Sequence, residues 1–93
     1  MIRTALGVYL HEWEARKQIG AAQGNRCIYC FVTLTWEVRR QPHALTCATL
    51  EHIVPKSMGG FDQMSNLAVS CHRCNNQRGA TPHGEFLNAF NSR

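Results

Sequence analysis

Apolar residues near the start of the chain recur with the spacing of an α-helix. Leu6, Leu10 and Trp13 stand at positions i, i+4 and i+7, which places them on one helical face. The expected helix runs from about residue 4 to residue 22, and the Gly24-Asn25 pair is a stop signal after it. We expect this helix to pack over a small core, with contact to DNA as the alternative.

Later segments have the composition of β-strands. Residues 31–38 are rich in β-branched and aromatic side chains and alternate in part, so we expect a strand there. A second strand is expected over about 45–53, closed by Pro55. A short return strand is expected over 67–70, and two glycines at 59–60 predict a loop between these two strands.

Two helices are expected after the return strand. The first begins near 71–74 and ends near Arg78, where Gly79 is suited to a C-cap, and the second begins at about Pro82. We therefore predict one small α+β domain over residues 1–93. It comprises an N-terminal helix within 1–24, a core over 27–79 and a C-terminal helix over 82–93.

Length and charge narrow the class of protein. A chain of 93 residues buries about 60–65% of its unfolded surface, so such domains often need a disulfide, a metal or a partner. Ten Lys and Arg against six Asp and Glu give a net charge of +4, which is compatible with a nucleic-acid partner. The first twenty residues carry several charges and no apolar signal segment, so we expect a cytoplasmic protein without a membrane partner.

Four of the five cysteines form two CxxC pairs, Cys27 with Cys30 and Cys71 with Cys74. In a reducing compartment, such pairs bind metal more often than they form disulfides. Two CxxC turns close a tetrahedral zinc shell with Zn–S distances of about 2.3 Å. We predict a structural zinc, with two disulfides as the alternative. Cys47 falls inside a predicted strand and is expected to be a small buried hydrophobe.

A carboxylate and an imidazole stand together at Glu51-His52. An imidazole with an unperturbed pKa of about 6.5 can be neutral at pH 7, so it can take a proton from an attacking water. Alternation puts these two side chains on opposite faces of an ideal strand. The strand end must therefore twist or bulge if both are to reach one phosphate.

The chain resembles the HNH endonuclease family, the ββα-metal nucleases, in its zinc-stapled, double-CxxC form. The resemblance runs from about Cys27 to Gly79 and is carried by four elements in order: C-x-x-C, T-L-E-H-I-V-P-K-S-x-G-G, S-N-L and C-H-R-C-N-N-Q-R-G. It implies a ββα-metal core and an endonuclease that hydrolyses DNA, leaving 5′-phosphate and 3′-hydroxyl ends. Nicking and double-strand cleavage both remain open.

The resemblance also implies roles for four residues. His52 is the expected general base, and Glu51 and Asn75 are the expected ligands of a divalent ion. Asn66 is expected to brace the loop after His52 and to orient His52 by hydrogen bonding. Oxygen ligands suit Mg²⁺ or Mn²⁺, whereas the thiolates retain Zn²⁺. Asn75 stands where many relatives have histidine, which makes this an H-N-N variant, and Glu51 replaces the commoner aspartate.

Each assignment has a plainer alternative. Lys56, Arg73 and Arg78 are candidate phosphate contacts or simply solvated charges. Asn75 could instead be a hydrogen-bonding residue at a helix start. His83 has no neighbour in the sequence pattern and is expected at the surface.

Three other functions compete with catalysis: a zinc-stapled nucleic-acid-binding module, a protein adaptor built on a zinc ribbon, and an HNH fold that has lost activity. Little of the chain remains for reading bases. A nuclease of this size is therefore expected to be weakly specific, or to act as a homodimer or within a larger bacterial or phage assembly. The family resemblance places it in a bacterial cell or a phage-infected host.

Overall fold

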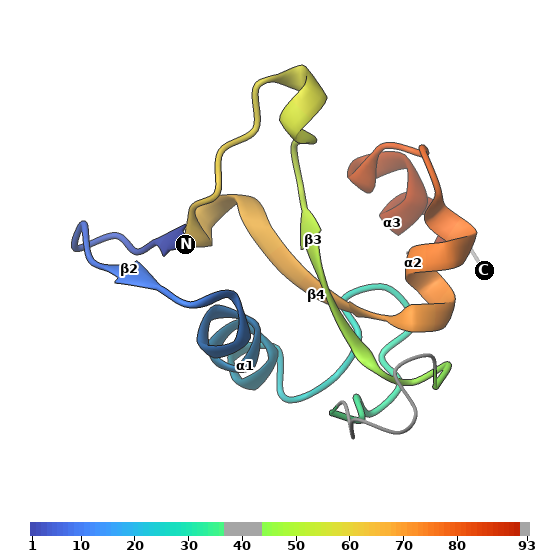
Figure 1. Ribbon diagram of the computed structural model, residues 1–93. Helices are drawn as coiled ribbons and strands as arrows, with labels where there is room; N and C mark the ends of the chain where they lie inside the picture. The colour runs from blue at the N-terminus through green and yellow to red at the C-terminus, as the bar shows by residue number, and fades with distance from the viewer. Residues whose placement is uncertain (37–43, 92–93) are drawn as a thin grey trace.

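A two-stranded antiparallel sheet lies at the centre of the protein (Figure 1). The computed structural model describes residues 1–36 and 44–91. Strand β3 (Ala48–His52) pairs with β4 (Leu67–Cys71), and the register is unbroken from Ala48 opposite Cys71 to His52 opposite Leu67. The expected return strand is confirmed, and the strand before it is shorter than predicted at both ends.

The helices cover this sheet from two sides. Helix α1 (Glu12–Ala22) lies on one side, and α2 (His72–Arg78) and α3 (His83–Asn91) lie on the other (Figure 1). Both C-terminal helices are confirmed, and Gly79 ends α2 in the left-handed region with φ 49°. No helix within residues 1–36 and 44–91 is long and apolar enough to cross a membrane.

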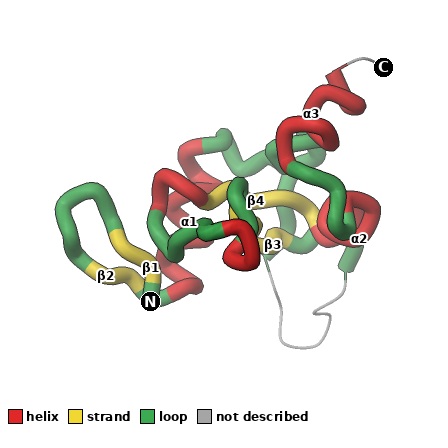
Figure 2. Tube along the Cα trace, turned by 90° about the horizontal axis from the view of Figure 1, so that it is seen from above, coloured by secondary structure: helices red, strands yellow, loops and turns green. Residues whose placement is uncertain are grey.

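The prediction of a helix from residue 4 is wrong over its first two turns. Strands β1 (Ile2–Arg3) and β2 (Tyr9–Leu10) form a hairpin instead, which projects beyond α1 (Figure 2). Gly7 has a φ of 77° at the tip, a conformation that a helix does not contain. The helical spacing that included Leu6 was misleading, because Leu6 is 90% exposed.

The predicted strand over 31–38 is also wrong in its described part. Residues 31–36 make only isolated bridges, between Arg26 and Thr33 and between Thr35 and Cys47. Phe31 has a φ of 63°, because the chain must turn sharply after the first CxxC. The last two positions of that prediction lie outside the described residues.

The core is built where α1, the CxxC turns and β4 meet. Its fully buried members include Ala15 from α1, Tyr29 from the first CxxC and Val69 from β4. Ile19 and Leu34 are also buried and complete the contact. Ala15 and Ile19 therefore form the part of α1 that faces the core, whereas Trp13 is 37% exposed.

Two 3-10 turns, η1 (Lys56–Met58) and η2 (Met64–Asn66), shape the loop that joins β3 to β4. Gly59 has a φ of 90° after η1. A Cβ on Gly60 would overlap the carbonyl oxygen of Val54 and lie 2.9 Å from Asn66 Nδ2. This close approach requires glycine.

We expect Gly60→Ala to lower the free energy of unfolding by about 1–3 kcal/mol, because the overlap is with rigid backbone. Gly84→Ala is the matched control: its Cβ would meet no atom within 4 Å, and alanine favours the helix. Urea denaturation of the two variants with zinc present measures the difference. Equal stability of both variants would contradict the close approach at Gly60.

Candidate active site and zinc centre

The four cysteines of the two CxxC pairs come together in space. Their Sγ atoms all lie within 4.8 Å of one another, and the cysteines are free thiols. Three of the four are buried, and Cys30 is half-buried. Soft sulfur ligands in such a cluster fit a tetrahedral Zn²⁺. The predicted zinc centre is therefore supported by the fold, and the disulfide alternative is not.

Local hydrogen bonds shape both halves of this centre. The backbone N–H of Tyr29 donates to Cys27 Sγ at 3.4 Å, and that of Cys74 donates to Cys71 Sγ at 3.4 Å. Burial raises the pKa of the Cys71 thiol to about 11 and also raises that of Cys74. A bound Zn²⁺ would favour the thiolate form of these sulfurs, because metal binding displaces the thiol protons.

Cys47 does not join the cluster. Its side chain is buried, as predicted for a small hydrophobe in this region. Cys47 can therefore serve as a control residue in tests of zinc binding by the four clustered cysteines.

His52 ends β3 and is held by a residue that the sequence did not suggest. His52 Nε2 lies 2.6 Å from Asp62 Oδ1, and Asp62 Oδ2 lies 2.8 Å from Lys56 Nζ. These hydrogen bonds, that of Lys56 foremost, lower the pKa of Asp62. A carboxylate only accepts hydrogen bonds, so the proton between the two side chains belongs to Nε2. The other ring nitrogen, Nδ1, has no hydrogen bond to any residue in the described part of the chain.

Asn66 braces the loop after His52. Its Oδ1 accepts a hydrogen bond from Val54 N at 2.8 Å, and its Nδ2 donates to Val54 O at 3.0 Å and to Phe61 O at 3.1 Å. These bonds agree with the expected bracing. The expected direct hydrogen bond to His52 is not among those of the described residues, and Asp62 takes that place.

Glu51 points to the opposite face of β3 from His52, as alternation requires. Because the register of β3 and β4 is unbroken, the expected twist or bulge does not occur within the strand. Glu51 is 4% exposed, and its carboxylate accepts hydrogen bonds from three donors. These are Tyr29 Oη at 2.6 Å, Ser70 Oγ at 2.8 Å and Arg78 Nη1 at 2.9 Å.

This buried network changes the interpretation of two further residues. Arg78 is 8% exposed and ion-paired with Glu51, so its expected phosphate contact does not fit this geometry. His83 is half-buried, and its Nδ1 lies 2.8 Å from Tyr29 Oη, which corrects its expected place at the surface. Burial lowers the pKa of His83. Both contacts join residues far apart in the sequence, so no local pattern could have revealed them.

Asn75 is exposed on α2, three residues before Arg78. Positions i and i+3 are neighbours on a helix surface, so Asn75 lies close to the side of α2 that meets Glu51. Lys56 and Arg73 are both exposed, as a phosphate contact requires.

Residues 27–91 match the family model described as HNH endonuclease. The chain belongs to the HNH endonuclease family. It is also 32% identical over 68 residues to the CRISPR-associated endonuclease Cas9 of Corynebacterium diphtheriae. That alignment covers 72% of this chain but only 5% of the Cas9 protein. The β1–β2 hairpin and α1 lie outside the segment that matches the family model.

We expect Cys74→Ser to abolish stoichiometric zinc binding and cooperative unfolding, because structural zinc contributes about 10–16 kcal/mol in small domains. Cys47→Ala is the control, since it removes a buried thiol outside the cluster. Zinc content by mass spectrometry and thermal unfolding by circular dichroism measure both effects. A Cys74→Ser protein with full zinc content would contradict the four-cysteine centre.

We expect Glu51→Gln to destabilise the fold by about 3–5 kcal/mol, because Arg78 would be left buried without a countercharge. The double variant Glu51→Gln/Arg78→Met should recover part of that loss. Glu14→Gln, on the exposed face of α1, is the control and should change stability by less than about 0.5 kcal/mol. Equal effects of Glu51→Gln and Glu14→Gln in urea denaturation would show that the buried ion pair does not support the fold.

Proposed function

We propose that this chain is a divalent-metal-dependent endonuclease that hydrolyses DNA phosphodiester bonds, with His52 as the general base. The observation that carries the proposal is the hydrogen bonding of the two nitrogens of the His52 ring. Its Nε2 is held by Asp62, while Nδ1 makes no hydrogen bond to the described residues. A neutral imidazole in this arrangement has its lone pair on Nδ1, ready to accept a proton from water.

Glu51 and Asn75 would hold Mg²⁺ or Mn²⁺. Both offer oxygen ligands, which these ions prefer. A carboxylate has about four acceptor positions, and Glu51 uses three of them on Tyr29, Ser70 and Arg78. One acceptor position of Glu51 therefore remains for a hard ion, and the buried Arg78 is a neighbouring cation. When bound, the ion would neutralise charge on the phosphoryl and leaving oxygens.

The chain's own contribution to hydrolysis is proton transfer and positioning. His52 Nδ1 takes a proton from a water whose oxygen attacks the phosphorus atom. The bond from phosphorus to the 3′ oxygen breaks, and that oxygen takes a proton from solvent, which leaves 5′-phosphate and 3′-hydroxyl ends. Asn66 keeps the loop beside His52 in place through its bonds to Val54 and Phe61.

Contacts to the DNA backbone are proposed for two exposed cations. Lys56 lies in η1 next to the Asp62–His52 pair, and Arg73 lies in the first turn of α2. Such contacts position a protein on DNA without reading its sequence. Choice of target would then come from a second copy or from a larger assembly.

A second candidate is a zinc-stapled nucleic-acid-binding module without catalysis. The observation in its favour is that Glu51, the proposed ion ligand, is already paired with Arg78. Both candidates bind DNA, so the distinguishing measurement is cleavage.

We expect His52→Ala to slow metal-dependent cleavage of supercoiled plasmid by about 10²–10⁴-fold, the usual contribution of a general base. DNA affinity should stay unchanged, because the substitution removes no phosphate-binding cation. His11→Ala is the control, since His11 is exposed at the start of α1, on the side of the sheet away from α2. Reactions with Mg²⁺, Mn²⁺ and EDTA test the ion requirement. Absence of metal-dependent cleavage by the wild-type protein would favour the second candidate, and cleavage by His52→Ala at the wild-type rate would contradict the assignment of His52 as the base.

A further inference from the structure

We infer that Asp62 is the positioning residue for His52, accepting its Nε2–H and so leaving Nδ1 as the nitrogen that receives the proton. This inference rests on the proposed function, because it names what sets the state of the proposed base. The distance of 2.6 Å between His52 Nε2 and Asp62 Oδ1 is that of a short, strong hydrogen bond.

The chemistry of imidazole makes such a partner necessary. A neutral ring carries its proton on either nitrogen, and the hydrogen bond made by one nitrogen decides which form is present. With Asp62 as an acceptor, only the form protonated on Nε2 satisfies the pair. Without it, part of the population would carry the proton on Nδ1 and could not act as the base from that atom.

Asp62 is itself restrained from several directions. Lys56 Nζ lies 2.8 Å from the carboxylate oxygen that does not contact His52. The backbone carbonyl of Asp62 accepts from Arg3 N at 2.9 Å. Phe61, the preceding residue, is held by Asn66. The carboxylate is therefore fixed by its side-chain partner and by the backbone on which it is carried.

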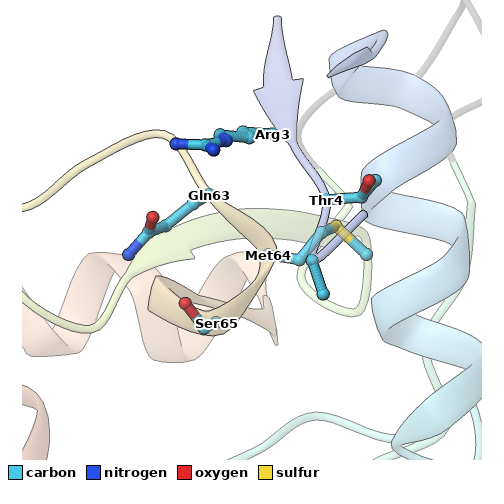
Figure 3. A pocket seen from close by; sticks show the side chains of 6 residues that line it. Arg3, Thr4, Gln63, Met64 and Ser65 are labelled. Atoms are coloured by element: carbon cyan, nitrogen blue, oxygen red, sulfur yellow. The ribbon is translucent and has the colours of Figure 1, made fainter. Parts of the chain in front are cut away.

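The N-terminal hairpin supplies part of this restraint. Arg3 forms a parallel bridge with Gln63, and the hairpin lies against the segment that follows Asp62 (Figure 3). A small pocket of about 200 Å³ marks the junction, with Arg3 and Thr4 on one side and Gln63, Met64 and Ser65 on the other. The hairpin that supports Asp62 lies outside the segment that matches the family model.

A structural role alone would predict a different outcome from a positioning role. Asp62 is only partly buried, and the ion pairs that such residues make add little to folding stability. Removal of the carboxylate should therefore leave the fold intact while it changes the state of the His52 ring.

The test compares wild type with Asp62→Ala, Asp62→Leu and Asp62→Asn. Long-range ¹H–¹⁵N NMR spectra of the histidine side chains, recorded well above the imidazole pKa of about 6.5, report which nitrogen carries the proton. The His52 signals are assigned by their loss in His52→Ala. Single-turnover cleavage of supercoiled plasmid and DNA affinity in EDTA are measured on the same proteins. Thermal unfolding and zinc content establish that each variant is folded.

We expect wild-type His52 to carry its proton on Nε2 alone, and Asp62→Ala and Asp62→Leu to show a mixture of both forms. Their single-turnover rates should fall about 10–100-fold, as is usual when the partner that orients a histidine is removed. Asp62→Asn keeps an acceptor oxygen and should recover part of both effects. Glu14→Gln, which removes an exposed carboxylate from α1, should match wild type in every measurement.

An unchanged ring state and rate in Asp62→Ala and Asp62→Leu would overturn the inference. Failure of both variants to fold would also overturn it, because it would show a structural role. These results are separate from the proposed function, which fails if the wild-type protein does not cleave DNA or if His52→Ala cleaves like wild type. The NMR measurement needs no cleavage activity, so it tests Asp62 even in that case.

Discussion

The convergence of four cysteine sulfurs is the constraint on which the rest of the structure depends. Cys27 and Cys30 bracket Tyr29, while Cys71 ends β4 and accepts the first hydrogen bond of α2. Because the two pairs meet, Tyr29 is brought to Glu51 of β3, and α2 is set against the same strand. A small core of this kind gains its stability from the metal as much as from apolar burial.

Adjacent residues of β3 serve two separate networks because a strand alternates its side chains. Glu51 faces inward, where Tyr29, Ser70 and Arg78 satisfy it in a setting of low dielectric. Its neighbour His52 faces the loop, where Asp62 holds its Nε2. The interior pair holds α2 to the sheet, whereas the loop pair remains accessible to a substrate. The proposed proton transfer therefore depends on β3, which carries His52, and on the loop after it, which carries Asp62.

The loop between β3 and β4 is ordered by its own backbone more than by apolar contacts. Gly60 passes close to Val54. The side chain of Asn66 accepts a hydrogen bond from the backbone N–H of Val54 and donates one to the backbone carbonyl of Phe61. Met58 and Phe61 are 74% and 72% exposed, so little hydrophobic burial supports this segment. Hydrogen bonds and one tightly packed glycine thus set where Asp62 meets His52.

The sequence by itself determined the features whose cause is local. The CxxC spacing specifies a metal-binding turn, Gly79 ends α2, and the segment around Glu51-His52 carries the pattern of the HNH family. The family resemblance implied that Asn66 braces its loop, and its hydrogen bonds to Val54 and Phe61 agree with that part of the expectation. These features depend on neighbouring residues and could be predicted without the fold.

Only the tertiary structure decided the partners of those residues. Asp62 reaches His52 after a loop closure, Arg78 reaches Glu51 from a helix 27 residues away, and the N-terminal hairpin replaces a predicted helix where it docks on residues 62 and 63. Hydrogen bonds and ion pairs between distant segments have no periodicity in the sequence. They follow from the geometry of the folded chain, which is why His52 could be singled out from the sequence and its partner Asp62 could not.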